Sequence, residues 1–381
     1  MKHTVALKQN HEFRRLYAKG KSAVSPYFAI YCRQTRRPYS RLGITTGVKL
    51  GKAVKRNYAR RRIRELYRTN EDKLLPGYDV VVVDNLRTGH WQAVKGARKL
   101  YVGDLRDAAF LDTVFSENHI DGVINFAAYS LVGESVTNPL KYYGNNVAGS
   151  QSMLTAMKEH GVDKIVFSST AATYGEPEKQ PIEECDRTDP TNPYGATKLA
   201  IEGMLKWCDK AYGIHYVALR YFNAAGSNPD VGIGEDHNPE SHLIPLVMKT
   251  ALGQRDHIGI FGDDYPTPDG TCVRDYIHVR DLAEAHLLAL EHLEKTGESG
   301  VFNLGSGDGY SVKEIIDTAR RITGKAIPAV VEPRRAGDPS VLIASNHKAA
   351  EVLGWTPKRG LEEIIADAWT WHSGHPNGYE N

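Results

Sequence analysis

The stretch Gly-Tyr-Asp-Val-Val-Val-Val-Asp-Asn-Leu at residues 77–86 marks the point where one sequence pattern ends and another begins. Its four consecutive valines follow a Leu-Pro-Gly turn and predict a buried β-strand over residues 78–83. Further strands are expected near 99–103, 122–127, 164–169 and 215–221, separated by helical segments near 107–118, 138–160 and 194–212. This alternation predicts an α/β fold with a doubly wound parallel sheet.

The residues before this strand follow a different, α+β pattern. A short helix is expected over 8–19, strands over 27–33 and 40–46, and a strongly basic helix over 52–69. Beyond about residue 226 the order is less regular, because loops rich in proline and glycine interrupt it. We therefore predict a small basic module at 1–77, the doubly wound sheet at 78–225 and a smaller C-terminal domain at 226–381.

Charge divides the chain at the same place. The 381 residues have a formal net charge of +2, yet residues 1–76 hold 20 Lys and Arg against 4 Asp and Glu, and the remainder carries −14. This asymmetry indicates a nucleic-acid-binding segment joined to an acidic globular part.

The spacing of the cysteines and the length of the apolar runs indicate in which cellular compartment the chain is expected. The four cysteines lie far apart with no Cys-x-x-Cys spacing, so we expect no metal site and no disulfide framework. A reduced, cytoplasmic setting fits this composition. No apolar run is long enough to span a bilayer, so no membrane association is expected.

The predicted helix at 52–69 concentrates the positive charge. Its basic residues form a stripe of Lys52, Arg56, Arg60 and Arg64, with Arg61 beside it. Between residues 49 and 68 only Glu65 offsets nine basic residues. A solvated helix face is the usual explanation for surface charge, but a stripe this basic favours contact with nucleic-acid phosphates.

The run Ala-Val-x-Arg-Asn-x-x-Arg-Arg-x-x-Arg-Glu at 53–65, with Arg-Leu-Gly-Ile at 41–44, resembles the protein subunit of bacterial ribonuclease P over about residues 1–83. The resemblance implies binding of ribonuclease P RNA and precursor tRNA. It assigns RNA contacts to Phe13, Tyr17, Lys52, Arg56, Asn57, Arg60, Arg61 and Arg64. From the residues alone, Phe13 and Tyr17 suit base stacking or packing onto the sheet equally well.

Residues 192–198 read Asn-Pro-Tyr-Gly-Ala-Thr-Lys, a Tyr-x-x-x-Lys pair at the start of a predicted helix. This spacing places Tyr194 and Lys198 on one face, where the ammonium can lower the pKa of the phenol from its ordinary value of about 10. The spacing alone is weak evidence. The strand at 164–169 leads into Thr170, however, and a hydroxyl there can polarise the same substrate oxygen.

Further strings extend this pattern, namely GDLRD at 103–107, FSSTAATYG at 167–175, LRYFNAAG at 219–226 and EPRRAGDPS at 332–340. Together they resemble the extended short-chain dehydrogenase/reductase family, and within it the UDP-glucose 4-epimerases, over residues 78–381. The resemblance implies an NAD(P)-binding Rossmann-like fold, bound NAD, and a homodimer. It also implies interconversion of UDP-glucose and UDP-galactose through a 4-keto intermediate.

The same resemblance implies roles for individual residues. Tyr194 is the base for the sugar 4-hydroxyl, Lys198 its pKa-lowering and ribose-binding partner, and Thr170 a hydroxyl donor. Cofactor binding is expected at Asp84, Asn85, Asp104, Leu105, Phe126, Ala127, Ala128, Asn145 and Phe222. Substrate binding is expected at Asn223, Leu243, Phe261, Arg274, Arg335 and Asp338, although the two arginines taken alone suit surface ion pairs better.

The sequence differs from related dehydratases at a position that decides the reaction type. It also differs from the whole family in the segment that binds the cofactor. Ala171 and Ala172 stand where related dehydratases have an Asp-Glu pair, which favours epimerisation over elimination. The family also begins with a strand, a Gly-x-x-Gly-x-x-Gly turn and a helix that hold the NAD pyrophosphate. Nothing before Asp84 matches this unit. We therefore expect a damaged position in the sheet beside strand 78–83, and weak binding of NAD.

Three hypotheses follow from these patterns. The first is an epimerase fused to a ribonuclease P protein component. The second is an RNA-binding protein that carries a catalytically impaired epimerase fold. The third is a sugar-nucleotide dehydrogenase or another epimerase of the same family.

Overall fold

The computed structural model describes residues 80–335 and 339–379, together with the backbone of four short strands within the first 42 residues. The chain forms two compact units, residues 1–80 and 81–381. The helices predicted at 8–19 and 52–69 and the predicted RNA-contacting residues lie outside the described residues, as does Asp338.

The described part of the first unit consists of two strand pairs. Strand β1 (Thr4–Ala6) pairs in parallel with β4 (Ser40–Leu42), and β2 (Lys21–Val24) pairs antiparallel with β3 (Ala29–Cys32). Strands β3 and β4 lie within the strands predicted at 27–33 and 40–46. Strands β1 and β2 were not predicted, because three or four residues are too few to establish a period-two pattern.

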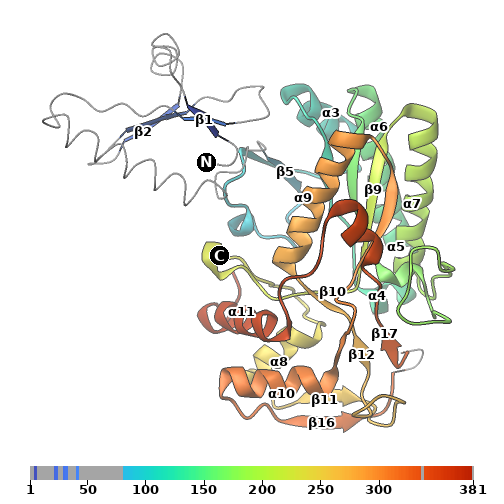
Figure 1. Cartoon of the computed structure of the whole chain (residues 1–381), viewed down its shortest axis with the longest axis vertical. Coiled ribbons are helices and arrows are strands. Elements are labelled where there is room, and N and C mark those ends of the chain that lie inside the picture. Colours follow the sequence, from blue (N-terminus) through green and yellow to red (C-terminus); the bar gives the residue numbers. More distant parts are fainter. Residues whose placement is uncertain are drawn as a thin grey trace, which may run out of the picture. The chain divides into compact units, whose positions relative to one another are not determined.

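The second unit contains the predicted alternation of strands and helices (Figure 1). Its sheet strands are β5 (Val81–Asp84), β6 (Lys99–Val102), β7 (Val123–Asn125), β8 (Lys164–Ser168), β9 (His215–Tyr221) and β14 (Gly300–Leu304). Its helices in this half are α3 (Ala108–Glu117), α4 (Val132–Thr137), α5 (Pro139–Tyr142), α6 (Ala148–Glu159), α7 (Pro193–Tyr212) and α9 (Val279–Thr296). Short 3-10 or π segments are η3 (Trp91–Ala93), η4 (Tyr143–Val147), η5 (Ala171–Thr173), η6 (Pro229–Val231) and η7 (Ala349–Leu353).

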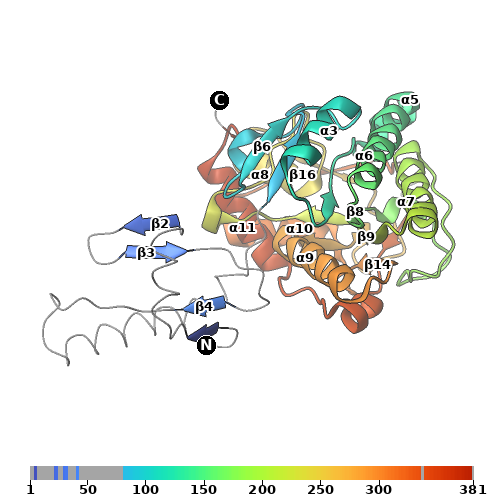
Figure 2. The same cartoon turned by 90° about the horizontal axis from the view of Figure 1, so that it is seen from above.

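Strands β14, β9, β8 and β7 form a parallel sheet in that order, covered on both faces. Successive strand residues point to opposite faces. Ile165 and Phe167 of β8 pack against α6 and α7, whereas Val166 packs against α9. Figures 1 and 2 show α9 on one side of these strands and α6 and α7 on the other. The resulting core explains why β8 and β9 are almost continuously apolar.

The sheet is divided where the sequence predicts damage. Strand β5 pairs in parallel with β6, from Val81 opposite Lys99 to Asp84 opposite Val102. Among the described strands, this pair has no hydrogen-bonded connection to β7. In a doubly wound sheet of this family the first strand lies between the two strands that correspond here to β5 and β7. The valines of β5 are accordingly only half-buried, whereas Val166 and Val217 in the four-stranded sheet are fully buried.

The remaining elements form a second layer, drawn in the lower part of the second unit in Figure 1. They are β10 (Asn223–Ala225), β11 (Ile258–Phe261), β12 (Val273–Arg274), β13 (Tyr276–His278), β15 (Tyr310–Ser311), β16 (Ala329–Glu332), β17 (Val341–Leu342), α8 (Leu243–Ala251), α10 (Val312–Thr323) and α11 (Leu361–Gly374). Helices α8, α10 and α11 share an apolar core with β11. Within the described residues, no helix is both long and apolar enough to cross a bilayer.

Candidate active site

Tyr194 and Thr170 are brought together by the close approach of α7 to the segment that follows β8. The side chain of Asn192 caps α7 by accepting a hydrogen bond from the Gly195 N–H at 2.9 Å. A Cβ at Gly195 would lie 2.4 Å from the carbonyl oxygen of Ala172, so only glycine allows this contact. The Thr170 hydroxyl consequently lies beside the Tyr194 phenol, where it opposes the rise in the pKa of Tyr194 that burial causes.

Lys198 lies one helical turn behind the phenol and is buried. Its Nζ donates a 2.7 Å hydrogen bond to the carbonyl oxygen of Ser168, at the end of β8. The same Nζ lies 6.0 Å from the centroid of the Tyr194 ring. Burial lowers the pKa of Lys198 to about 7, against a smaller opposing effect of Glu202.

The predicted lowering of the phenol pKa is not seen in this structure. Burial raises the pKa of Tyr194, and the hydrogen bond with Thr170 is the factor that opposes the rise. The physical reason is that Lys198 directs its Nζ to the Ser168 carbonyl and itself loses charge through burial. The site holds a protonated phenol that is ready to form hydrogen bonds with a substrate hydroxyl.

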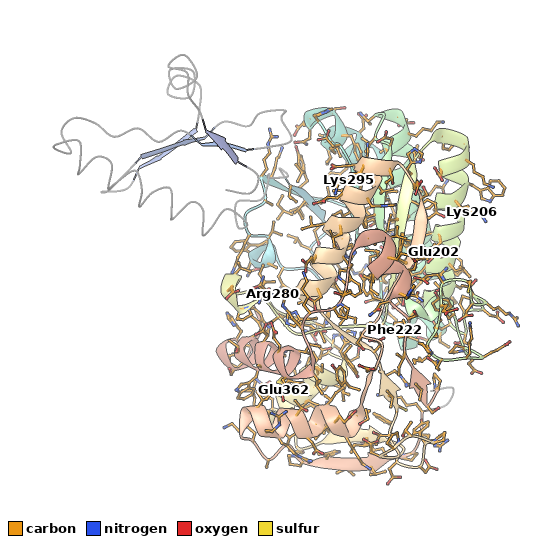
Figure 3. All side chains as sticks on the ribbon, viewed as in Figure 1. Glu202, Lys206, Phe222, Arg280, Lys295 and Glu362 are labelled. Carbon is orange, nitrogen blue, oxygen red and sulfur yellow. The ribbon has the colours of Figure 1, made fainter. Side chains whose placement is uncertain are left out.

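A buried ion pair behind Lys198 was missed by the sequence analysis. Arg220 of β9 binds Glu202 through two nitrogens, at 3.0 and 2.5 Å, and both side chains are at most 7% exposed. Ser169 donates to the same carboxylate at 2.5 Å. Tyr194, Lys198 and Glu202 repeat at i, i+4 along α7, and that ladder was the available signal. Figure 3 labels Glu202 on α7.

The residues predicted to hold the adenosine end of NAD lie at the carboxyl ends of β5 and β6. Asp84 ends β5 and accepts a 2.6 Å hydrogen bond from the Leu86 N–H. Asp104, just after β6, binds Arg106 at 2.7 and 2.8 Å, and this guanidinium holds the carboxyl pKa well below its usual range. Asn85 also hydrogen-bonds Asp104, whereas Leu105 packs into the core beside α3 and α6.

The residues predicted for the nicotinamide side come from three separate segments. After β7, Phe126 is 57% exposed and Ala127 donates its N–H to the side chain of Asn125 at 3.0 Å, with Ala128 following. Asn145 lies in η4 and donates to the Asn146 side chain at 3.0 Å. Phe222 follows the last residue of β9 (Figure 3).

The predicted substrate residues belong to the second layer. Asn223 of β10 donates its side-chain amide to the Asp275 carbonyl at 2.9 Å, and Leu243 is the first residue of α8. Arg335 places its guanidinium 3.9 Å from the centroid of the Phe261 ring. Arg274 of β12 donates to the Val273 carbonyl at 2.8 Å. The structure thus brings Phe261 and Arg335 together and connects Asn223 to the segment that follows Arg274.

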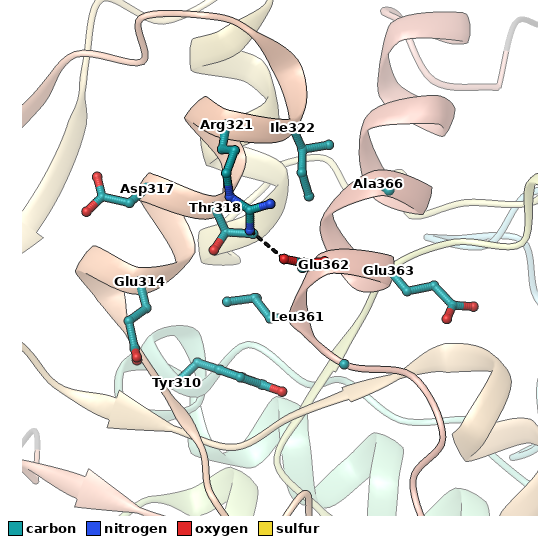
Figure 4. A pocket seen from close by; sticks show the side chains of 11 residues that line it. Tyr310, Glu314, Asp317, Thr318, Arg321, Ile322, Leu361, Glu362, Glu363 and Ala366 are labelled. Carbon is teal, nitrogen blue, oxygen red and sulfur yellow. Dashed lines mark hydrogen bonds and ion pairs between the residues drawn. The ribbon is translucent and has the colours of Figure 1, made fainter.

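Two surface hollows among the described residues lie away from the Tyr194 site. One lies between α10 and α11, where Arg321 and Glu362 form an ion pair across it (Figure 4). Its lining contains none of the predicted site residues. The other lies beneath residues 86–92, immediately after Asp84, and includes Asp236 and Asn238.

Comparison with known proteins supports both parts of the chain. The NAD dependent epimerase/dehydratase family matches residues 70–305, and the Ribonuclease P family matches residues 1–96. A UDP-glucose 4-epimerase of Halalkalibacterium halodurans is 60% identical over 304 residues, which is 80% of this chain and 91% of that protein. A UDP-glucose 4-epimerase of Streptococcus mutans is 57% identical over 305 residues, 80% of this chain and 92% of that protein.

Solved structures of UDP-glucose 4-epimerases also match this chain. A crystal structure of UDP-glucose 4-epimerase matches with a TM-score of 0.79 at 57% identity, covering 80% of this chain and 93% of that one. The enzyme of Bifidobacterium longum, in complex with NAD⁺ and UDP, matches with a TM-score of 0.75 at 41% identity, covering 82% and 96%. The predicted α/β fold, the NAD cofactor and the fusion of two families are confirmed. The chain belongs to the NAD dependent epimerase/dehydratase family and carries a segment of the Ribonuclease P family at its N-terminal end.

Proposed function

We propose that the second unit interconverts UDP-glucose and UDP-galactose at the Tyr194 site. The observation that carries this proposal is the group at the carboxyl end of β8, where the Thr170 hydroxyl lies beside the Tyr194 phenol and buried Lys198 lies one turn behind. The relatives described above are UDP-glucose 4-epimerases, which supports this pair of substrates.

Each of the three residues then has a distinct task. Tyr194, as the phenolate, accepts the proton of the sugar 4-hydroxyl and later returns it, while Thr170 holds the phenol oxygen and the sugar oxygen in line. Lys198, when charged, favours the phenolate, because a nearby positive charge lowers the pKa of a phenol. NAD, when bound, would supply the reversible hydride chemistry at the sugar C4.

The residues present fit the two ends of NAD but not its pyrophosphate. Asp84 offers a carboxylate at the end of a parallel strand, where family members hold the adenosine ribose. Asn145, Phe126 and Phe222 offer an amide and two aromatic rings for the nicotinamide side. The sequence before Asp84 contains no Gly-x-x-Gly-x-x-Gly turn, and β5 has no strand partner on its β7 side among the described residues. We propose that NAD binds weakly.

A pair of Tyr→Phe variants tests the assignment of the base. Conversion of UDP-galactose should be followed with NAD⁺ added in excess, because weak binding would otherwise limit the rate. Tyr194→Phe should reduce the rate roughly a hundredfold or more. Tyr212→Phe, at the exposed end of the same helix, is the matched control and should keep the parent rate. A Tyr194→Phe protein as active as this control would exclude the mechanism.

We also propose that the first unit binds ribonuclease P RNA and precursor tRNA. The family match over 1–96 and the excess of 20 basic over 4 acidic residues in 1–76 support this. Neutralising backbone phosphates releases counterions, so binding should weaken steeply as salt rises. Charge reversal of Arg56, Arg60 and Arg64 together should reduce both the affinity and the salt slope.

A cytoplasmic homodimer through the helices at 138–160 and 194–212 completes the proposal. Large apolar side chains are exposed on both segments, with Leu140 82% and Trp207 67% exposed. Such side chains on neighbouring helices are typical of an interface. Helices α5 and α7 contact one another, so the two segments offer one continuous surface.

A further inference from the structure

We propose that Glu235, His237, Glu240 and His242 form a binding site for one divalent transition-metal ion of the Zn²⁺ type. Two imidazoles and two carboxylates converge in the segment between η6 and α8, and one ligand atom from each lies within 4.8 Å of the other three. Imidazole and carboxylate together suit zinc and its neighbours, whereas magnesium and calcium prefer oxygen alone. This site was not predicted from the sequence, where only cysteine spacing was considered.

The spacing of the ligand atoms agrees with four-coordinate geometry. The Nδ1 atoms of His237 and His242 lie 3.1 and 3.0 Å from the same oxygen of Glu235. The two Glu240 oxygens lie 3.6 and 3.0 Å from these nitrogens. A tetrahedral zinc site with bonds of about 2.0 to 2.1 Å has ligand atoms about 3.3 to 3.4 Å apart. Each of these four nitrogen–oxygen separations therefore lies within a few tenths of an ångström of the tetrahedral value.

The Glu240 carboxylate and the Glu235 backbone are held in place independently of any ion. One Glu240 oxygen accepts hydrogen bonds from the N–H groups of Ser241 and His242, both at 2.8 Å, and this side chain is only 3% exposed. The Glu235 carbonyl accepts from the Trp371 indole at 3.0 Å. Partners of this kind orient metal ligands and reduce the ordering that binding requires.

The neighbouring backbone is fixed by the C-terminal region. A Cβ on Gly234 would lie 2.1 Å from the Trp371 ring, so the chain passes directly against the indole. The Gly234 N–H donates to the Tyr379 hydroxyl at 3.1 Å, and His90 contacts the Asp236 carbonyl at 3.0 Å. The loop that presents the four ligands is thus attached to three distant parts of the unit.

Without a metal ion, protons on the two histidines can balance the charge of the two carboxylates. In the absence of an ion, the two carboxylates raise the pKa of His237 to about 9 and that of His242 to about 10, giving a compact network of two imidazolium and two carboxylate groups. One divalent ion replaces two protons with no change in net charge. Charge balance therefore permits both states, and direct measurement of metal binding separates them.

The location gives the ion a structural consequence. His242 immediately precedes Leu243, the first residue of α8 and a proposed substrate contact. An ion at this site would join the loop to the start of that helix and order the approach to the substrate region. The metal inference does not rest on the proposed epimerase activity, because its readouts are metal content and thermal stability.

The test uses the full chain, freed of metal by dialysis against a chelator. Titration with ZnCl₂ should add one equivalent of Zn²⁺ with micromolar or tighter affinity, and this equivalent should be absent from the double variant His237→Ala, His242→Ala. The matched control is His119→Ala, His347→Ala, which removes two histidines that are 92% and 86% exposed elsewhere. Glu235→Gln provides a second variant that keeps both rings, and it should weaken binding at least tenfold.

Thermal unfolding supplies an independent readout. Zn²⁺ should raise the unfolding temperature of the parent and of the control, and leave that of the His237/His242 variant unchanged. Loss of the equivalent in both the double variant and Glu235→Gln supports the site. A parent that binds no Zn²⁺, or an equivalent that survives in either variant with unchanged affinity, overturns it. Binding of Mg²⁺ by the parent as tightly as Zn²⁺ would also contradict the proposal that the histidine rings are ligands of the ion.

Discussion

Replacing Glu202 by glutamine should be among the most destabilising single changes in the second unit. Its carboxylate binds two nitrogens of Arg220 and the Ser169 hydroxyl, and both members of the ion pair are at most 7% exposed. The amide keeps the shape but leaves the guanidinium buried without a counter-charge. Breaking a buried pair from one side costs about 3 to 5 kcal/mol. For a unit of this size that corresponds to a fall in unfolding temperature of roughly 6 to 10 °C.

Tryptophan fluorescence isolates the unit concerned, because all five tryptophans follow residue 90. The matched control is Glu362→Gln, which removes a carboxylate paired with Arg321 at 2.7 Å where both side chains are more than half exposed. An exposed pair is worth at most about 1 kcal/mol, so the control should shift the transition by roughly 2 °C or less. A Glu202→Gln transition within the range of the control would show that burial of this pair has been overestimated.

Three further predictions concern charge and assembly. Burial lowers the pKa of Lys198 to about 7, well below its value in the unfolded chain. Between pH 7 and 9 the lysine is therefore protonated in the unfolded chain and largely neutral in the folded one, so the free energy of unfolding should rise with pH. Relative to Lys198→Met, the parent should gain roughly 2 kcal/mol of stability over this range, as measured by urea unfolding. A gain that is absent, or a loss, would contradict the assignment. The double variant Leu140→Lys, Trp207→Lys should be a monomer in light scattering, where the parent is a dimer. The control Val352→Lys changes a side chain that is 43% exposed on η7 and should leave the dimer intact. A parent that is already monomeric would exclude this interface. Charge reversal of Arg56, Arg60 and Arg64 should weaken binding of ribonuclease P RNA at fixed salt, and unchanged affinity would remove the helix from the RNA interface.

The doubly wound sheet could be predicted because its signal is local. Continuous apolar runs such as Lys164–Ser168 and His215–Tyr221 are strands buried on both faces, and their alternation with helices defines the topology. The Tyr194, Lys198 and Thr170 group was likewise accessible, since helical spacing and the end of a strand place them without knowledge of distant contacts.

Features that depend on tertiary contacts were not predicted. The direction of Lys198 toward the Ser168 carbonyl, which removes the expected effect on the phenol, depends on how α7 meets β8. The Glu202 and Arg220 pair joins a helix to a strand 18 positions away. The four ligands of the proposed metal site are close in sequence, but their convergence depends on anchoring by Trp371 and Tyr379. Packing of this kind is not encoded in spacing.

The most direct test of the account is calorimetric titration of NAD⁺ into the purified full chain. The central claim is that the catalytic residues lie at the carboxyl end of a four-stranded sheet, while β5 and β6 form a separate pair among the described strands. The sequence before Asp84 also lacks the Gly-x-x-Gly-x-x-Gly turn that holds the NAD pyrophosphate. The account predicts weak binding, detectable only at NAD⁺ concentrations well above micromolar. Stoichiometric binding with micromolar or tighter affinity would contradict it, and would show that other residues of this chain rebuild the pyrophosphate site.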